Sequence, residues 1–301
     1  MKIEFYIPEN IIFKEEIDEQ TLINVFSFGI IQGSAVLNSK HEETKSRKAS
    51  FEEKEKEFLE FLIKNSANYF KRKKTEIHQY LGGLKQSLIE HLGEKGIVRE
   101  IQMKLTYRGS FGVSSTFGQI PFEVGLYIHP YFNVPYIPAS SIKGAIRNAY
   151  YYYLVNHENE NRDKADDECN RLFGDSNFAG LVGFTDAFPI QEGENGYILY
   201  PDIINPHYKD AKNEMEVEPK PIIFLTVAPD TTFKFYMYII KEGEKEKRKI
   251  EIGAKKDLAA KPIPDMEKLG KLDLALLFGL SMGIGAKTAL GYSQFVVITY
   301  E

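Results

Sequence analysis

The chain has 301 residues, of which 43% are hydrophobic. Its net charge of −5 at pH 7 argues against a free-standing, non-specific nucleic-acid binder, so any contact with nucleic acid must be local. Its length allows one large domain or two ordinary ones, and we favour one domain with additions. The single Cys169 excludes an internal disulfide bond, and the chain start lacks a signal-peptide pattern. No apolar stretch approaches the roughly 20 residues of a membrane helix. We therefore expect a cytoplasmic protein without a membrane partner.

The first 97 residues predict a largely helical N-terminal extension. Residues 38–57 are rich in charged residues and read as a mobile loop or a frayed helix start. From residue 58 to residue 92 apolar residues recur at helical spacing, and Gly93 or Gly96 is the expected stop. One helical stripe contains Ile77, Leu81, Leu84, Leu88 and Leu92.

Residues 98–301 predict a second domain that mixes strands and helices. The expected strands are 98–107, 181–188, 223–240 with a break at 228–230, and 292–300, and the expected helices begin near Pro138 and span 265–280. The order of these elements is β-α-β-β-α-β. We therefore predict an α+β fold with a ferredoxin-like, RRM-like core.

A long insertion interrupts this domain at about residues 189–221. It is rich in Pro, Asn, Asp and Glu, and a loop of this length inside a compact domain is usually functional or disordered. Asn205, His207 and Tyr208 follow the pattern of an Asn-Pro turn that presents its neighbours outward. They are candidate contacts to RNA or to another subunit, and the alternative for His207 is an ordinary loop histidine.

The first motif lies at the start of the helix that Pro138 introduces. Ser140 or Ser141 is a plausible N-cap, and the exposed N–H groups of a helix start favour a bound phosphate. Lys143 and Arg147 would add positive charge on one face of the helix, and Gly144 would permit close approach of another backbone. The alternative is a capped surface helix whose cations face water.

The second motif is a glycine loop at residues 283–291. The candidate residues are Gly283, Gly285, Ala286, Lys287 and Thr288. Residues 285–288 superficially resemble a P-loop, but Ala286 separates glycine from lysine and the loop follows a helix instead of preceding one. What remains is a flexible turn with free amides and one lysine, suited to a phosphate backbone without base selectivity. A purely structural turn would explain Gly283 but neither Gly285 nor Lys287.

The remaining chemistry-bearing residues indicate neither a metal nor a cofactor. The six histidines show no pair at metal-ligand spacing, and one cysteine cannot form a zinc cluster. His78 and His91 read as surface residues. The aromatic residues at 150–153 and 233–238 could stack bases in part, but most of them read as core.

Taken together, several of these segments resemble the RAMP superfamily of CRISPR-associated proteins. The resemblance covers about residues 98–301 and rests on the segments 138–147, 173–174, 183–186, 202–208 and 283–291. Two positions depart from the family pattern, because Ala139 and Ser293 stand where glycines are usual. At both positions the freedom of glycine to adopt positive φ is lost.

The resemblance implies a subunit of a type III-B (Cmr) RNA-guided complex of antiviral defence. Such a subunit holds the guide RNA near its 3′ end beside target RNA and other subunits of the hetero-oligomer. Relatives that cut RNA carry an acidic residue in the loop after the first core strand, and here residues 109–118 contain no carboxylate, so we expect no catalytic residue. The alternative is a metal-independent endoribonuclease that matures guide RNA, with His207 or His129 as general acid or base beside Lys143.

Overall fold

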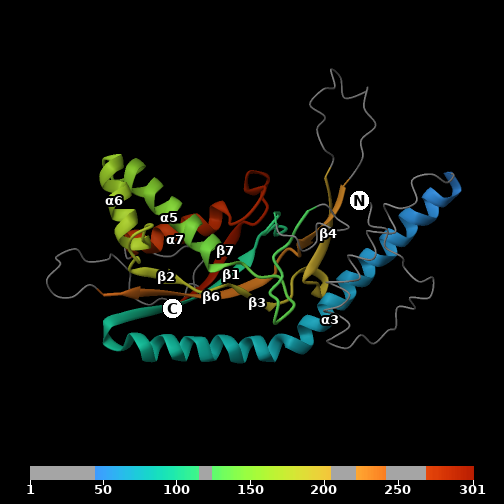
Figure 1. Cartoon of the computed structure of the whole chain (residues 1–301), viewed down its shortest axis with the longest axis horizontal. Helices are drawn as coiled ribbons and strands as arrows, with labels where there is room; N and C mark the ends of the chain where they lie inside the picture. Colours follow the sequence, from blue (N-terminus) through green and yellow to red (C-terminus); the bar gives the residue numbers. More distant parts are fainter. Residues whose placement is uncertain (1–44, 115–123, 205–221, 242–268) are drawn as a thin grey trace, which may run out of the picture.

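The computed structural model describes residues 45–114, 124–204, 222–241 and 269–301, which form a mixed structure of helices and antiparallel strands (Figure 1). The helices are α3 (Lys45–Leu92), α5 (Ala139–Asn156), α6 (Arg162–Phe173) and α7 (Lys271–Met282), with short 3₁₀ turns η2 (Gly93–Lys95), η3 (Glu194–Gly196) and η7 (Thr288–Leu290). The strands are β1 (Gly96–Leu105), β2 (Val182–Phe184), β3 (Phe188–Gln191), β4 (Leu199–Ile204), β5 (Ile222–Val227), β6 (Thr232–Ile240) and β7 (Phe295–Tyr300). The predicted α+β class is thus confirmed.

One antiparallel sheet forms the centre of the molecule. Its strand order is β2-β6-β1-β7, and β3 also pairs with β6. Met103 of β1 stands opposite Phe233 of β6 on one side and opposite Val297 of β7 on the other. Strand β1 therefore lies in the interior of the sheet, where its alternating apolar residues are buried on a packed face.

Helices α5, α6 and α7 cover one face of this sheet (Figure 1). The apolar positions of α5 recur at helical spacing, and Ile142 and Ile146 are fully buried with Leu276 of α7. Gly279 of α7 lets the two helices approach closely, because a Cβ atom there would lie 3.0 Å from the Ile146 side chain and 3.2 Å from Ala149. The aromatic residues Phe233 and Phe235 lie in this core, in agreement with the core interpretation of most aromatics.

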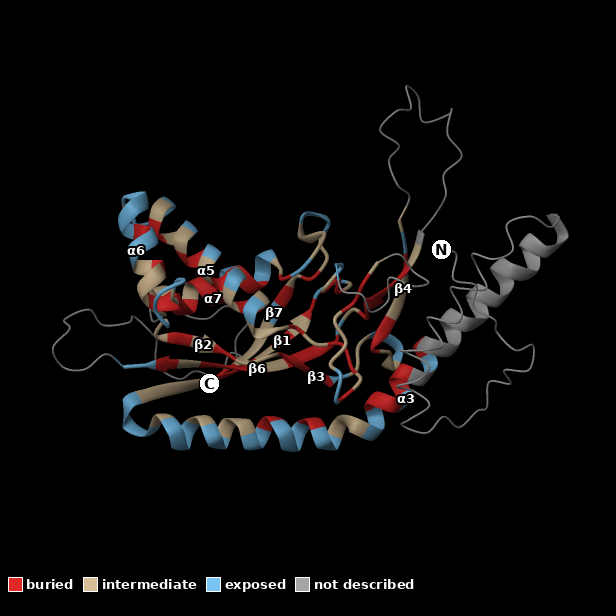
Figure 2. Ribbon diagram, viewed as in Figure 1, coloured by how far each residue is buried: buried red, intermediate tan, exposed pale blue. Residues whose placement is uncertain are grey.

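Helix α3 covers the opposite face of the sheet (Figure 2). The predicted stripe is confirmed in part, because Ile77 and Leu81 are buried against Phe188 and Tyr236, while Leu84 and Leu88 are half-buried. The helix begins at Lys45, so residues 45–57 agree with the helix start, and not with the loop, of the two alternatives for 38–57. The sheet face that an RRM uses to stack bases is therefore occupied by a helix of the same chain.

The insertion is more regular than a single loop. Strands β3 and β4 lie inside residues 189–221 or at their edge, and β4 pairs with β5 from Leu199↔Val227 to Ile204↔Ile222 to form a two-stranded hairpin. Asn205, His207 and Tyr208 lie outside the described residues. Between β1 and α5, Ile128 and Pro135 form an isolated bridge. Among the helices that the structure describes, none combines the length and the apolar character needed to cross a membrane.

Candidate functional site

The start of α5 is capped differently from the sequence prediction. The N-cap is Pro138, not Ser140 or Ser141, since the backbone of Pro138 is extended, with ψ 141°, and Ala139 is already the first helical residue. The first helical N–H, that of Ala139, donates a hydrogen bond of 2.7 Å to the Asp186 carboxylate. A carboxylate thus already satisfies part of the positive helix end.

The remaining N–H groups of this first turn differ in whether they have a hydrogen-bond acceptor. The Ser141 and Ile142 N–H groups donate to the Pro138 carbonyl oxygen at 2.9 and 3.2 Å. Within the described residues, the Ser140 N–H has no acceptor. Any anion that binds the backbone at this end therefore meets chiefly one amide.

Four of the five residues predicted at α5 line one open hollow of about 560 Å³. They are Ser140, Lys143, Gly144 and Arg147, and the opposite wall is the loop at residues 173–180. Ser141 is not among the lining residues. We call this site, with its two walls, the α5 hollow.

The cations of the α5 hollow differ in their surroundings. Lys143 makes no ion pair with the residues that the structure describes, so its ammonium group can bind an incoming anion. Arg147 donates a hydrogen bond of 2.8 Å to Asn170 Oδ1 and lies 4.0 Å from the Asp166 carboxylate of α6. The Asn170 bond fixes the guanidinium at the side of the hollow, and the distant, exposed pair with Asp166 contributes little.

The glycine loop is fixed by backbone hydrogen bonds and is not the flexible turn that the sequence suggested. The Ala286 N–H donates to the Ser110 carbonyl oxygen at 2.9 Å, and the Ile284 N–H donates to Ser293 at 2.9 Å. Gly285 has φ +130°, and a Cβ atom there would lie 2.5 Å from the Ser110 oxygen. Only glycine fits this conformation and this close approach. Among the described residues, no acceptor is found for the N–H groups of Gly285, Lys287 and Thr288.

Lys287 does not extend freely into solvent. Its ammonium nitrogen lies 4.9 Å from the ring centroid of Phe224 and 5.4 Å from that of Tyr292. Burial lowers the pKa of Lys287, and the nearby Asp202 carboxylate opposes that shift. The lysine thus joins the glycine loop to strand β5 through cation–π contacts.

A buried carboxylate next to Lys287 was missed by the sequence interpretation. Asp202 of β4 accepts hydrogen bonds from the Arg108 guanidinium, from the Tyr292 hydroxyl and, at 2.8 Å, from the Ile203 N–H. Burial and the bond to Asp202 raise the pKa of Tyr292 to about 12. The three side chains stand about 90 residues apart in the sequence, so no local pattern could have found them.

The family departure at Ser293 does not change the backbone in the expected way. Ser293 adopts φ 57° although it is not glycine. Its hydroxyl oxygen accepts a hydrogen bond of 2.9 Å from the Ser110 N–H and is fully buried. The expectation that positive φ is lost here was wrong, because a buried hydrogen bond offsets the strain of the left-handed conformation.

The histidines that the structure describes stand apart from these residues. His129 packs against the rings of Phe132 and Phe188, at centroid distances of 5.2 and 5.0 Å, and burial lowers its pKa. His78 and His91 are exposed on α3, as predicted. Within the described ranges, no group of three or more histidine, cysteine, aspartate or glutamate side chains could hold a metal ion.

Comparisons with known proteins agree with the motifs. A relative from Saccharolobus solfataricus, the CRISPR system CMR subunit Cmr6, is 32% identical over 257 residues, which span 85% of this chain and 77% of the relative. The CRISPR system Cmr subunit Cmr6 of Pyrococcus furiosus is 28% identical over 232 residues, covering 58% of this chain and 62% of the relative. A chain in the solved structure of the type III-B Cmr-beta complex bound to cognate target RNA has a TM-score of 0.66 at 25% identity and covers 94% of this chain and 98% of its own. The model of the RAMP superfamily matches residues 82–296, and the chain belongs to that superfamily.

Proposed function

We propose that this chain is a non-catalytic, cytoplasmic RNA-binding subunit of a type III-B CRISPR (Cmr) effector complex. It would hold the backbone of the guide RNA near its 3′ end and help to position target RNA beside the other subunits. Support comes from the similarity to two Cmr6 subunits and to a chain of a Cmr complex bound to target RNA.

The observation that carries the proposal is that Ser140, Lys143 and Arg147 line one open hollow. A Lys or Arg side chain held against phosphate reads charge and not bases, which suits a subunit that must accept guides of any sequence. The net negative charge of the chain makes a local cationic surface of this kind the natural place for RNA.

The glycine loop would form a second contact through its backbone. Gly283, Gly285, Ala286 and Thr288 form a rigid turn, and three N–H groups of the loop have no acceptor among the described residues. Amides that are held in place bind an anion without an ordering cost. Lys287 would act at this site mainly by keeping the loop in position, since its ammonium group lies over two rings.

Other features fit the same assignment. The strand order β2-β6-β1-β7 supports a ferredoxin-like core within the domain at residues 98–301, which an extension at residues 1–97 would precede. Asn205, His207 and Tyr208, which follow β4 in the chain, would be contacts to RNA or to a neighbouring subunit. The endoribonuclease alternative requires a histidine beside Lys143, and His129 packs among aromatic rings instead.

The test is RNA binding by the full chain with Lys143→Ala and Arg147→Ala combined. Affinity should fall by a similar factor for two unrelated single-stranded RNAs, and the slope of log K against log salt should fall by about one to two units. The control variant, Lys73→Ala with Lys95→Ala, removes equal charge from α3 and from the η2 turn that follows it. Equal effects of the two double variants would show that Lys143 and Arg147 of α5 do not hold the RNA backbone.

A further inference from the structure

We propose that the α5 hollow holds one unstacked nucleotide of the bound RNA, with its base against the ring of Phe178 and its phosphate at Lys143 and Arg147. This inference rests on the proposed function and makes it more specific. It names a base-binding residue that no sequence motif indicated.

Phe178 is an unusual residue to leave in solvent. Its side chain is 74% exposed although it lines the α5 hollow. Exposed aromatic faces in such positions commonly mark binding sites, because a large apolar ring gains free energy when a ligand covers it. Bases of any kind can stack on a ring, so the contact would not select a sequence.

The loop that carries Phe178 is held rigidly. Asp175 Oδ1 accepts hydrogen bonds from the Asn177 and Phe178 N–H groups at 2.7 and 2.8 Å, and the Asp175 N–H donates to the Phe178 carbonyl oxygen at 3.1 Å. Gly174 and Ala179 form a bridge at the base of the loop. The ring is therefore presented by a preformed turn, which reduces the entropic cost of stacking.

The α5 hollow has room for a base. Its volume of about 560 Å³ lies in the range of roughly 300–1,000 Å³ that ligand sites span. A Cβ atom added at Gly144 would meet no atom within 4 Å, so this glycine leaves the wall of the hollow open. Phe173, which also lines the hollow, is buried and packs against Tyr150 with ring centroids 5.9 Å apart, so this part of the lining is held in place.

The charges of the α5 hollow suit a phosphate at one side only. Lys143 and Arg147 lie on the α5 wall together with the Ser140 N–H. Asp175 lies on the opposite wall, and its Oδ1 is occupied by the two loop amides. A phosphate would therefore bind at α5, while the uncharged base would lie toward Phe178.

Binding of two RNAs, each 12 nucleotides long, by the full chain tests this inference. One carries a uracil at every position, and the other has the same backbone with every base removed. Phe178→Leu should weaken binding of the base-bearing RNA about 5- to 150-fold without changing its salt slope, because stacking releases no counterions. The same variant should bind the abasic RNA as the wild type does, and Phe178→Tyr should retain wild-type binding of both.

A second variant guards against a folding artefact. Gly144→Leu fills the α5 hollow with a residue that favours helix, and it should reproduce the selective loss for base-bearing RNA. If Phe178→Leu and Gly144→Leu leave both RNAs unaffected while Lys143→Ala with Arg147→Ala weakens both, the base pocket is overturned and the backbone grip stands. If all of these variants bind both RNAs as the wild type does, the proposed function at α5 fails as well. If Phe178→Leu instead lost a co-purifying protein while its RNA binding stayed unchanged, Phe178 would be a subunit contact and the base pocket would be overturned.

Discussion

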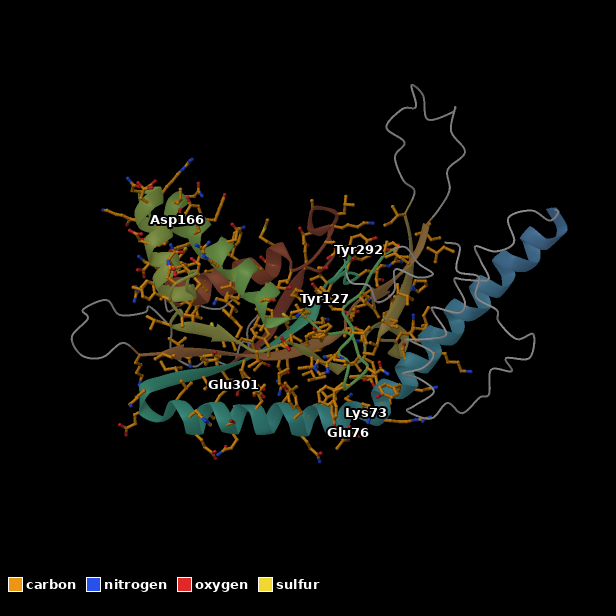
Figure 3. All side chains as sticks on the ribbon, in the orientation of Figure 1. Lys73, Glu76, Tyr127, Asp166, Tyr292 and Glu301 are labelled. Atoms are coloured by element: carbon orange, nitrogen blue, oxygen red, sulfur yellow. The ribbon has the colours of Figure 1, made fainter. Side chains whose placement is uncertain are left out.

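The ammonium nitrogen of Lys287 lies 4.9 Å from the ring centroid of Phe224, which joins the glycine loop to strand β5. The Tyr292 ring contacts the same ammonium group from the loop side, and its hydroxyl donates to Asp202 of β4. The glycine loop that follows α7 and the β4–β5 hairpin are thus one assembly. In Figure 3, Tyr292 lies at the glycine loop above the sheet and Lys73 lies on α3 below it, and strand β4 of the assembly extends to α3.

Substitution of Asp202 should loosen this assembly. Its side chain is only 8% exposed, and Asp202→Asn would leave the Arg108 guanidinium without its charged partner in a largely buried place. Loss of one partner of a buried pair costs about 3–5 kcal/mol, so we expect a fall of at least about 2 kcal/mol in the free energy of unfolding. Urea denaturation measures the change.

The control for Asp202 is an exposed ion pair beside the central sheet. Asp230 and Lys104 are 3.0 Å apart with side chains 58% and 45% exposed, and Asp230→Asn should change the free energy of unfolding by less than about 1 kcal/mol. If both variants lose the same amount, Asp202 does not hold the hairpin to the glycine loop.

Substitution by alanine should change the free energy of unfolding in opposite directions at two glycines. Gly285→Ala forces a side chain into φ +130° and against the Ser110 oxygen, so the free energy of unfolding should fall by about 1–3 kcal/mol. Gly144→Ala lies within α5 with no atom near the new methyl group, so it should raise that free energy by about 0.5–1 kcal/mol. Thermal and urea unfolding of both variants provide the comparison. A neutral Gly285→Ala would mean that the loop does not need its left-handed geometry.

The sequence predicted the regular elements well because they follow local rules. Helical spacing located α5 and α7 to within a few residues, apart from the part of the second expected helix at 265–268, which lies outside the described residues. Strands β1 and β6 followed from alternation and from the break at 228–230. These signals depend on residues a few positions apart, so tertiary contacts did not alter them.

The site was predicted only in part because its partners are distant in sequence. The α5 cations were found from their spacing, but the facing loop at 173–180 reaches them only through the packing of α6 on α5. The helix cap was missed for the same reason, since the carboxylate of Asp186 that binds the Ala139 N–H lies 47 residues later. Local patterns list the candidates, whereas the neighbours that give them a role come from the tertiary fold.

Acid should weaken the attachment of α3 to the sheet through Glu100. Burial would raise the pKa of this carboxyl, but hydrogen bonds from Lys234, Lys85 and Gln102 outweigh burial and lower the pKa to about 2, from an ordinary value of 4.5. A group whose pKa is lower in the folded state stabilises above its unfolded pKa and loses that contribution as the pH falls. We expect a loss of about 1–3 kcal/mol between pH 4.5 and 2.

The Glu100 prediction is checked with two glutamine variants. Glu100→Gln should lower stability at pH 7 and flatten the pH dependence of urea unfolding between pH 4.5 and 2. Glu76→Gln removes an exposed carboxylate that pairs with Lys73 on α3 at 3.0 Å and should leave the profile nearly unchanged. A wild-type profile in Glu100→Gln would contradict the assignment.

The isolated chain should leave RNA intact, with or without added divalent metal. Residues 109–118 contain no carboxylate, and His129 lies among aromatic rings with a lowered pKa. General acid-base help is typically worth about 10²- to 10⁴-fold in rate, so a true nuclease of this kind should lose most of its activity with one substitution. The assay follows end-labelled guide-repeat RNA and target RNA with the wild type, His129→Ala and His207→Ala. Site-specific cuts that disappear in either variant would refute the non-catalytic assignment and favour the endoribonuclease, whereas cuts that persist in both would indicate a contaminating nuclease.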